Sequence, residues 1–496
     1  MGFLTMPSFG VSALMVAVSV NVYVAASVIY NIWLHPLSRF PGPLYMRATR
    51  FGYIFHSTRG TLPFDMLGLH EKYGDIVRIG PNELAFSTVS SWQDIQGHRT
   101  KGQSDFPKSD WFSRPIKEQP VHIINADREE HSMLRRTLAN GFSDKGMREQ
   151  QPLITKYIDL LIQRLHENCR NGETELDVCA WYNWTTFDII GDLAFGEPFG
   201  CLENSTTHPW VELIFTMARA GTIIQSLGSF PKVRDFLLWC VPKSVSKDMV
   251  AHEDMAVAKI RRRMAVGNER PDLINGLVAR KDEWGISEEK LAANAGILII
   301  AGSETTATVL AGVTYYLMKD PIALKKATDE VRSVFKSEDD INFNSVNDLP
   351  YMLACLNEAL RCYPPVASGI PRDVPAGGAT VCDTFVPEGT NVSIHHWAMY
   401  HSTKYFKKPF EYRPERFLGD EEFTDDVREV LQPFHVGPRN CIGRNLAYVE
   451  MRTILARVLH SFDLKISDRS EGWLKQKNFN FWEKPPLYAH LTPRQD

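Results

Sequence analysis

The chain has 496 residues, of which 44% are hydrophobic and 23% are charged, and its formal net charge is −4 at pH 7. This composition supports a large globular core and gives no overall attraction for nucleic acid, so we expect no nucleic-acid partner. The eight cysteines are scattered without a Cys-x-x-Cys pair, which favours reduced thiols over a disulfide framework or a zinc site.

The N-terminal segment from Phe9 to Leu34 contains no charged side chain. As a helix it would reach roughly 39 Å, more than the bilayer hydrocarbon thickness of about 30 Å. A cleaved signal peptide is the alternative, but a charged n-region is missing and apolar residues continue past Ala25-Ala26-Ser27. We therefore predict an uncleaved membrane anchor over residues 1–35. The arginines that follow before the first acid predict that the rest lies in the cytosol: Arg39, Arg47, Arg50 and Arg59.

Residues 36–59 start with a proline-rich stretch, His35 to Pro43, which predicts a stiff hinge because proline fixes φ and lacks an N–H donor. No repeat, low-complexity stretch or Gly/Ser linker divides residues 60–496, so we predict one large domain there. A mainly α fold with a smaller β portion is expected. Helical periodicity covers 151–167, 181–193 and 353–362, and strand patterns cover 76–79, 84–86, 379–381 and 390–394.

The longest predicted helix starts near the N-cap candidate Ser287 and runs to Lys319, a length of about 50 Å. It is apolar almost all round, and Glu304 in its middle argues for a core helix over a second membrane span. Glu304 is followed by Thr305, and an acid beside an alcohol in an apolar helix is costly without a purpose. A threonine bonded to a carbonyl one turn earlier is the structural alternative.

The most informative sequence is Phe434-His435-Val436-Gly437-Pro438-Arg439-Asn440-Cys441-Ile442-Gly443. Its glycines allow close backbone approach, and Arg439 is a nearby positive charge. A helix predicted just after Cys441 would favour an anionic sulfur. These features suit a cysteine thiolate that ligates iron. An inert buried cysteine is the better explanation for a cysteine taken alone.

The run resembles the heme-binding signature of the cytochrome P450 family, Phe-x-x-Gly-x-Arg-x-Cys-x-Gly, with every fixed position filled. The resemblance implies the cytochrome P450 fold, heme b as the cofactor and Cys441 as its axial iron ligand, with Phe434, Arg439 and Gly443 beside the heme. Residues 301–306 resemble the family's oxygen-binding motif. By resemblance, Ala301 lies against the heme, Thr305 orients oxygen and Glu304 feeds a proton relay.

Further segments resemble the family in the expected order. Glu358 and Arg361 lie three apart on one helical face, and with Arg416 they match a Glu-Arg-Arg triad that would lock the cysteine loop. Cations that match heme-propionate positions are His131, Arg135, Arg372 and Arg439, although His131 replaces the family's tryptophan. The variable substrate pocket would include Ile297, Val366, Ile370 and Phe481, whose apolar character suggests an apolar substrate.

These resemblances imply a heme-thiolate monooxygenase of the endoplasmic reticulum membrane that takes O2 and an apolar small molecule. Electrons would come from NADPH through cytochrome P450 reductase, with cytochrome b5 as a second donor, and Arg128, Arg136 and Arg444 could dock the reductase. Residues 184–196 and 35–37 look like fungal members that modify secondary metabolites, including the trichothecene hydroxylase type. A heme-thiolate isomerase or dehydratase and a non-catalytic membrane heme sensor are the alternatives. His435 departs from the small serine usual after the phenylalanine.

Overall fold

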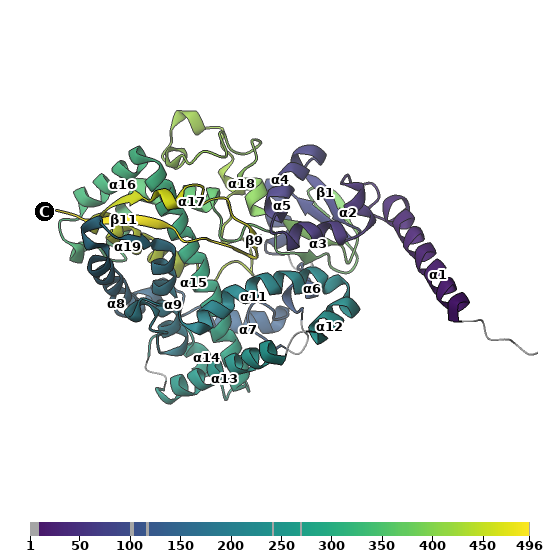
Figure 1. Ribbon diagram of the computed structural model, residues 1–496, viewed down its shortest axis with the longest axis horizontal. Helices are drawn as coiled ribbons and strands as arrows, with labels where there is room; N and C mark the ends of the chain where they lie inside the picture. Colours follow the sequence, from purple (N-terminus) through teal and green to yellow (C-terminus); the bar gives the residue numbers. More distant parts are fainter. Residues whose placement is uncertain (1–8, 100–103, 116–118, 241–242, 268–269, 496) are drawn as a thin grey trace, which may run out of the picture.

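The computed structural model describes residues 9–99, 104–115, 119–240, 243–267 and 270–495. The fold is mainly helical with a smaller β portion, as predicted (Figure 1). The helices are α1 (Phe9–Ile29), α2 (Leu44–Ala48), α3 (Phe51–Thr58), α4 (Leu62–Tyr73), α5 (Val89–Gln96), α6 (Asp110–Ser113), α7 (Arg128–Leu138), α8 (Asp144–Cys169), α9 (Val178–Phe195), α10 (Cys201–Asn204), α11 (Pro209–Ser226), α12 (Pro231–Trp239), α13 (Lys243–Ala265), α14 (Asn275–Ala279), α15 (Glu288–Lys319), α16 (Pro321–Val334), α17 (Pro350–Cys362), α18 (His396–Tyr400) and α19 (Arg444–Ser461).

Helix α15 crosses the core, as predicted from the apolar residues on nearly all of its faces. The hydroxyl of Ser287 accepts a hydrogen bond from the backbone N–H of Lys290 at 3.2 Å and so caps the first turn. Among the described residues, α9, α13, α16, α17 and α19 pack against α15. Two-thirds of the most apolar 18-residue stretch of this helix is buried inside the body. This burial makes α15 a core helix and not a second membrane span.

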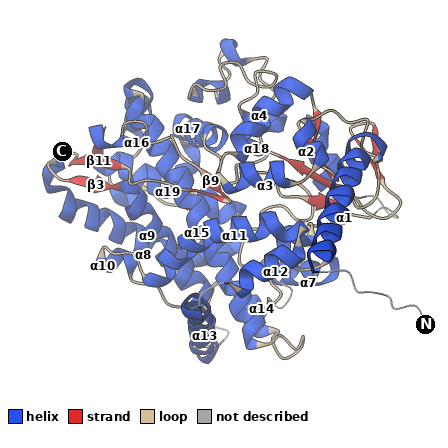
Figure 2. Ribbon diagram, turned by 45° about the vertical axis from the view of Figure 1, so that its right-hand side comes forward, coloured by secondary structure: helices blue, strands red, loops and turns tan. Residues whose placement is uncertain are grey.

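The strands form two main sheets at different ends of the body, drawn red in Figure 2. The strands are β1 (Ile76–Gly80), β2 (Glu83–Phe86), β3 (Glu175–Asp177), β4 (Arg372–Asp373), β5 (Ala379–Val381), β6 (Thr384–Val386), β7 (Asn391–Ile394), β8 (Phe462–Ile466), β9 (Asn478–Phe479), β10 (Phe481–Trp482) and β11 (Tyr488–Pro493). One sheet has the order β1-β2-β7-β4, in which β2 and β7 are parallel, and the other has the order β3-β11-β8. The predicted hairpin of β1 and β2 is confirmed as an antiparallel pair.

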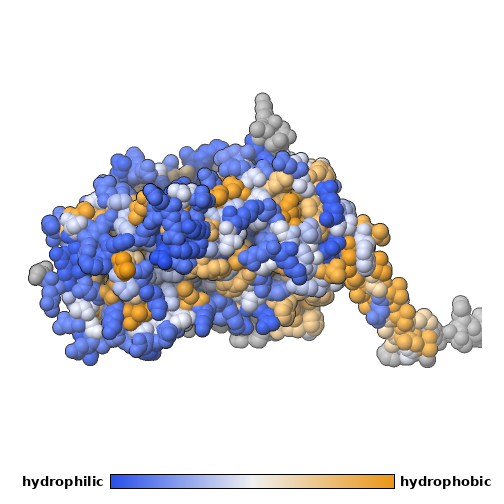
Figure 3. Space-filling view, turned by 90° about the horizontal axis from the view of Figure 1, so that it is seen from above, coloured by the Kyte–Doolittle hydropathy of each residue, from blue (hydrophilic) through white to orange (hydrophobic). Residues whose placement is uncertain are grey.

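Helix α1 projects from the body, and Figure 3 shows it mostly in the colour of hydrophobic residues. A five-residue π-helical turn, Tyr30–Leu34, continues it. Together they give an apolar stretch of 25 residues, Gly10–Leu34. None of its most apolar 18 residues is buried inside the body. The prolines after it end the helix, and α2 and α3 then pack against β1. The exposed helix is therefore held to the body through residues 36–59.

Candidate active site

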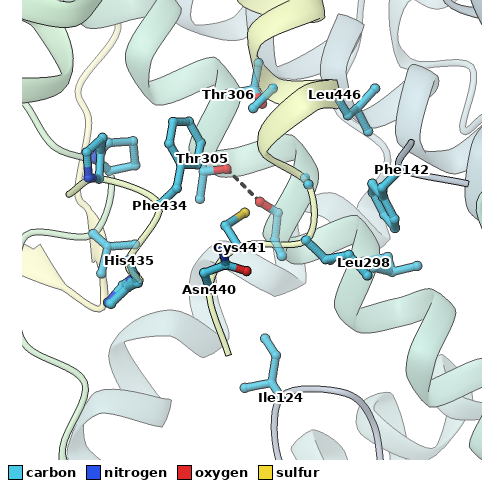
Figure 4. A pocket seen from close by; sticks show the side chains of 18 of the residues that line it. Ile124, Phe142, Leu298, Thr305, Thr306, Phe434, His435, Asn440, Cys441 and Leu446 are labelled. Atoms are coloured by element: carbon cyan, nitrogen blue, oxygen red, sulfur yellow. Dashed lines mark hydrogen bonds between the residues drawn. The ribbon is translucent and has the colours of Figure 1, made fainter. Parts of the chain in front are cut away.

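A cavity of about 260 Å³ lies between α15, α19 and the loop that carries Cys441 (Figure 4). Most of the sequence-predicted site residues line it. Helix α15 contributes Ile297, Ala301 and Thr305, and the segment after α17 contributes Val366 and Ile370. Helix α7 contributes His131 and Arg135, and the cysteine loop contributes Phe434, Arg439, Cys441 and Gly443. Three predicted residues do not line this cavity: Arg372, Glu304 and Phe481.

The cysteine loop is shaped by local hydrogen bonds and by one glycine. The backbone N–H of Cys441 donates to the carbonyl of Phe434 at 2.8 Å. Gly437 has φ +75°, and a Cβ there would lie 1.8 Å from the carbonyl oxygen of Gln96, so only glycine fits. Gly443 differs, because it has φ −84° and a Cβ there would make only ordinary contacts with the protein. Its backbone N–H donates to the Cys441 sulfur.

The side chain of Cys441 is accessible and lies on the cavity wall. Helix α19 begins at Arg444, so the thiol precedes a helix N-terminus, as predicted. Burial raises the pKa of this thiol, while the Gly443 N–H and the charges of Arg135 and Arg444 oppose the shift. A metal ion that binds the sulfur would displace the thiol proton, because the thiolate is the metal ligand.

Positive side chains gather at one end of the cavity. Arg135 donates to the backbone carbonyl of Asn440 at 2.6 Å, and Arg439 donates to the carbonyl of Ala126 at 3.1 Å. Lys108, which the sequence did not single out, also lines the cavity and donates to the carbonyl of Ile124 at 3.0 Å. Because Arg135 and Arg439 bind carbonyl oxygens and not carboxylates, their charge is available to an anion in the cavity. Burial, followed by Arg372 and Arg439, lowers the pKa of Lys108 well below its usual range, and an anion in the cavity would favour its charged form.

Arg372 and His131 lie close to these cations. Arg372 is buried behind the lining, pairs through its backbone with Lys108, and leaves its Nε without a partner in the described part of the chain. Burial and the nearby Arg439 lower the pKa of Arg372 to about 10. Burial, followed by four surrounding cations, lowers the pKa of His131 to about 4, so His131 is a neutral hydrogen-bonding group near pH 7.

Thr305 and Glu304 point to different surroundings, although they are adjacent. Thr305 lines the cavity, and its hydroxyl donates to the carbonyl of Ala301 at 2.7 Å, which leaves its lone pairs open to the cavity (Figure 4). Gly302, one turn away from Thr306, lines the cavity and also lets α9 approach, since a Cβ there would lie 3.0 Å from Ile190. Glu304 does not reach this wall.

Glu304 instead forms a buried ion pair with Lys484, from the segment between β10 and β11. The side chains of Glu304 and Lys484 are 1% and 4% exposed. Lys484 also donates to the hydroxyl of Thr308 at 2.7 Å, and Thr308 donates to Glu304 at 3.3 Å. Burial raises the pKa of Glu304, and Lys484 opposes the shift. The structure thus places Glu304 beside Lys484 and away from the cavity wall, and the relay role that the resemblance implies for Glu304 stays a prediction.

A second buried acid, Glu450 of α19, does line the cavity, and the sequence motifs gave no signal for it. Its hydrogen-bonding partner is Thr306 of α15. Burial raises the pKa of Glu450 to about 8. The carboxyl is therefore mostly protonated near pH 7, because no cation compensates its desolvation.

The predicted triad is assembled and fully buried. Glu358 accepts hydrogen bonds from Arg361 at 2.7 Å and from Arg416 at 3.0 Å. Arg361 also donates to the carbonyls of Tyr400 and Pro409. Asp426, which the sequence did not flag, pairs with Arg416 and balances the second arginine. This network joins α17 to the segments that lead into the cysteine loop.

The predicted pocket residue Phe481 lies elsewhere, in a second cavity of about 290 Å³. Lys484 is part of the same lining, together with Asp177, Cys179, Asn183 and Trp184. The other predicted pocket residues, Ile297, Val366 and Ile370, lie in the first cavity. β10 thus places Phe481 in the same cavity as Lys484, a position that side-chain composition alone could not reveal.

His435 adopts a left-handed conformation with φ +58° and packs between aromatic rings. Its ring centroid is 4.6 Å from that of His396 and 5.9 Å from that of Trp92. Burial, followed by the neighbouring His396, Arg372 and Lys108, lowers the pKa of His435 well below its usual range. His435 is therefore a neutral packing residue of the loop.

A cavity walled by a cysteine at a helix start, a cationic end and an alcohol on a core helix matches one family. The sequence profile described as cytochrome P450 matches residues 41–492. The chain belongs to the cytochrome P450 family. Cytochrome P450 monooxygenase prhB of Penicillium brasilianum is 44% identical over 474 residues, 95% of this chain and 96% of that protein. This membership shows that the chain is a cytochrome P450 monooxygenase.

Two other cytochrome P450 relatives match this chain over a similar length. Cytochrome P450 monooxygenase tpeC of Talaromyces stipitatus is 45% identical over 475 residues, 95% of this chain and 93% of its own. Trichothecene C-15 hydroxylase of Fusarium sporotrichioides is 42% identical over 478 residues, 95% of this chain and 96% of its own. The match to P450 enzymes of filamentous fungi therefore extends over almost the whole chain, and the family implies a heme-thiolate cofactor.

Proposed function

We propose that this P450 hydroxylates or otherwise oxidises an apolar small molecule of fungal secondary metabolism by inserting one oxygen atom from O2. The observation that carries the proposal is the cavity in which Cys441 lies on one wall and Thr305 on another, with cations at one end. The alternatives without reductive oxygen activation do not need this alcohol beside the thiol. A single cavity thus supplies a metal ligand, an oxygen-orienting group and an apolar lining.

The residues present fit heme b. Heme carries two propionates, and Lys108, Arg135, Arg372 and Arg439 concentrate positive charge where no carboxylate of the cavity lining neutralises it. The partnerless Nε of buried Arg372 is the donor that an anion would satisfy. Cys441 would hold the iron of the heme, because its sulfur accepts the Gly443 N–H and lies near the charges of Arg135 and Arg444.

Heme with a thiolate ligand supplies the redox chemistry that cleaves O–O bonds, and the protein supplies binding, orientation and proton control. Cys441 holds the cofactor from the cysteine loop, which Gly437 lets pack against Gln96. The hydroxyl of Thr305, anchored to the Ala301 carbonyl, is placed to orient oxygen or a water molecule. Apolar walls exclude bulk water from the reacting groups.

The substrate class follows from the rest of the lining. Apart from the cationic end, the walls carry aliphatic and aromatic side chains: Ile123, Ile124, Phe142, Ile190, Ile297, Leu298, Val309, Leu360, Val366 and Ile370. Asn294 of α15 holds the loop that precedes α7, because its side-chain oxygen accepts a hydrogen bond from the backbone N–H of Ile123 at 3.0 Å. Such a pocket favours a terpenoid, a polyketide or another largely apolar molecule, placed by shape more than by hydrogen bonds.

The test is a carbon monoxide spectrum of the reduced protein, followed by turnover with NADPH and reductase. Wild-type protein should give the thiolate-type band, and Cys441→Ser should lose it while remaining folded. Product masses from a panel of terpenoid and polyketide substrates should increase by one oxygen atom. A folded wild-type protein with no such band would refute the heme-thiolate assignment, and products of unchanged mass would support an isomerase instead.

We infer that α1 anchors the enzyme in the endoplasmic reticulum membrane, with the catalytic domain in the cytosol. The division into an anchor (1–35), a hinge and lead-in (36–59) and a monooxygenase domain (60–496) is part of this proposal. Large apolar side chains are also exposed on α3 and α12, namely Phe51, Phe55, Phe236 and Trp239, and they could rest in the bilayer interface. Fractionation and protease protection of the full chain in microsomes would test the orientation.

Electrons should arrive from NADPH–cytochrome P450 reductase, and cytochrome b5 is a second candidate donor. Arg136 and Arg444 are exposed near the cysteine side of the fold, and Arg128 is exposed but shares its charge with Asp105 at 3.0 Å. Exposed cations of this kind steer an acidic partner and set the salt dependence of its association. Arg136 and Arg444 are therefore the stronger docking candidates of the three.

A further inference from the structure

The pair between Glu304 and Lys484 has features that a purely structural ion pair does not need. Lys484 approaches one carboxylate oxygen, Oε1, which also accepts from Thr308. The other oxygen, Oε2, is buried and has no hydrogen-bond partner among the described residues. A buried carboxylate oxygen without a donor costs free energy, so this half-satisfied acid is a candidate functional group.

Lys484 connects this acid to a second space. It lines the second cavity, of about 290 Å³, which is more polar in its lining than the first and contains Asp177 and Asn183. Asn183 Oδ1 is also buried without a partner in the described part of the chain. A roomy cavity with unpaired polar atoms is the kind that holds ordered water. Glu304 thus lies between a candidate water site and the α15 wall that carries Thr305.

Charged neighbours of Glu304 are few. The titratable side chains that face it are Lys484, Cys179 of α9 and Tyr363 at the end of α17. Burial raises the pKa of both Cys179 and Tyr363, so both are neutral near pH 7. Within the described residues, Lys484 is therefore the group that determines whether Glu304 is ionised and where its carboxylate points.

We propose that Lys484 is a positioning residue for Glu304, and that the second cavity is the water-filled side from which Glu304 takes up protons for oxygen cleavage. The proposal rests on the monooxygenase function, in which each turnover consumes two protons together with two electrons, O2 and the substrate, and releases water and the oxidised product. It adds a residue outside the family motifs and a route that does not pass through the substrate cavity.

The proton step is balanced. A proton from water in the second cavity adds to the Glu304 carboxylate, and the hydroxide that remains takes up a proton from the buffer acid of the bulk solution, so that each step draws one proton from the solvent. The neutral acid no longer attracts the ammonium group, and its new O–H can be donated toward the hydroxyl of Thr305, the next residue of α15. Loss of that proton restores the ion pair. Lys484 thus returns Glu304 to the ionised, outward position after each transfer.

The variant Lys484→Met tests this role, because it removes the charged ammonium group and keeps an unbranched side chain only one heavy atom shorter. Without the cation, desolvation should leave Glu304 protonated at neutral pH, which infrared difference spectroscopy would detect as a new protonated-carboxyl band. The band should disappear in the Lys484→Met/Glu304→Gln double variant, which also removes the unpaired acid and so limits misfolding. This readout does not depend on heme or on turnover.

The functional arm measures product formed per NADPH and the solvent isotope effect in reductase assays with full-length enzyme. Lys484→Met should lower product per NADPH about tenfold and raise hydrogen peroxide, with a larger solvent isotope effect. Lys484→Arg, which can still hold a carboxylate, should recover most of the coupling. Lys475→Met is the matched control, since Lys475 is exposed and is not part of the lining of either cavity.

The outcomes separate the proposal from the function on which it rests. If the reduced carbon monoxide band is present in all variants but Lys484→Met keeps wild-type coupling and isotope effect, Lys484 does not position the relay and the proposal is overturned. The absence of a Glu304-dependent infrared band overturns it equally. If the wild-type protein itself lacks the carbon monoxide band, the heme-thiolate function fails first, whatever the infrared result.

Discussion

Two buried glutamates, Glu358 in α17 and Glu304 in α15, are both paired with cations, and they differ in how completely they are satisfied. Glu358 accepts from two arginines and from the backbone N–H of Arg413, and Asp426 balances the remaining charge. Glu304 has one lysine, and its second oxygen has no partner among the described residues. Both sites are almost inaccessible to solvent.

The complete network around Glu358 is suited to hold one structure, whereas the incomplete pair at Glu304 can change its ionisation state. Removing a partner from a complete buried network leaves an uncompensated charge, so such a network holds one geometry. An incomplete pair next to a cavity with a polar lining can lose its cation with less penalty. We therefore expect substitutions at Glu358 to act on stability, and those at Glu304, Lys484 and Thr305 to act on turnover.

The largest effect should follow Glu358→Gln. The variant leaves the buried Arg361 without its carboxylate and weakens Arg416, and we expect a loss of about 3–5 kcal/mol in the free energy of unfolding. Denaturant unfolding in detergent would measure it, together with retention of heme. Glu411→Gln is the control, because its pair with Arg413 is exposed and should cost less than about 1 kcal/mol. Equal losses in the two variants would contradict the scaffold assignment.

Glu450 provides the next effect, on the pH dependence of stability. Its pKa is about 8 in the fold and about 4.3 in an unfolded chain. Between these values the folded state keeps a proton that the unfolded state releases. The stabilisation is thus fully present below about pH 4 and is lost as the pH rises through about 8.

Glu450→Gln should therefore flatten the decline in unfolding free energy by about 2–3 kcal/mol between about pH 6 and pH 8. Denaturant unfolding of both proteins across this range measures the two slopes. The exposed Glu429→Gln variant should keep the wild-type slope. Parallel curves for wild type and Glu450→Gln would show that the carboxyl is not held neutral by burial.

Thr305→Ala should lower product formed per NADPH about tenfold, equivalent to about 1.4 kcal/mol, because oxygen loses the hydroxyl that orients it. Its effect on stability should be small, since Thr305 only donates to the carbonyl one turn earlier. Thr305→Ser keeps the hydroxyl and should restore coupling. If Thr305→Ala forms as much product per NADPH as the wild type, the Thr305 hydroxyl does not take part in oxygen activation.

The smallest effect should come from the exposed surface. Arg136→Glu should raise the reductase concentration for half-maximal rate two- to threefold, less than about 1 kcal/mol, and the effect should fade with salt. Lys475→Glu reverses another exposed charge and serves as the control. A reductase titration that does not distinguish the two variants would move the docking surface elsewhere.

Much of the architecture follows from local pattern. Alternating strands around Gly80 to Asn82 predicted the hairpin, and the apolar run after Ser287 predicted the core helix, because burial periodicity and capping act within a few residues. The cysteine loop, Thr305 and most of the cationic residues were also predicted, since the family motifs that mark them are contiguous. Lys108 and Asp426 were missed, because each acts through a contact that no contiguous motif marks.

The sequence by itself determined the family, the exposed apolar helix, the cysteine loop and the residues that approach one cavity, because these depend on contiguous motifs and hydrophobic patterning. Only the tertiary structure decided that Glu304 turns away from that cavity to meet Lys484, that Phe481 lines a second cavity, and that Glu450 is held neutral. The physical reason is that the charge state and direction of a buried group depend on desolvation and on partners 180 residues or so away, as Lys484 is from Glu304.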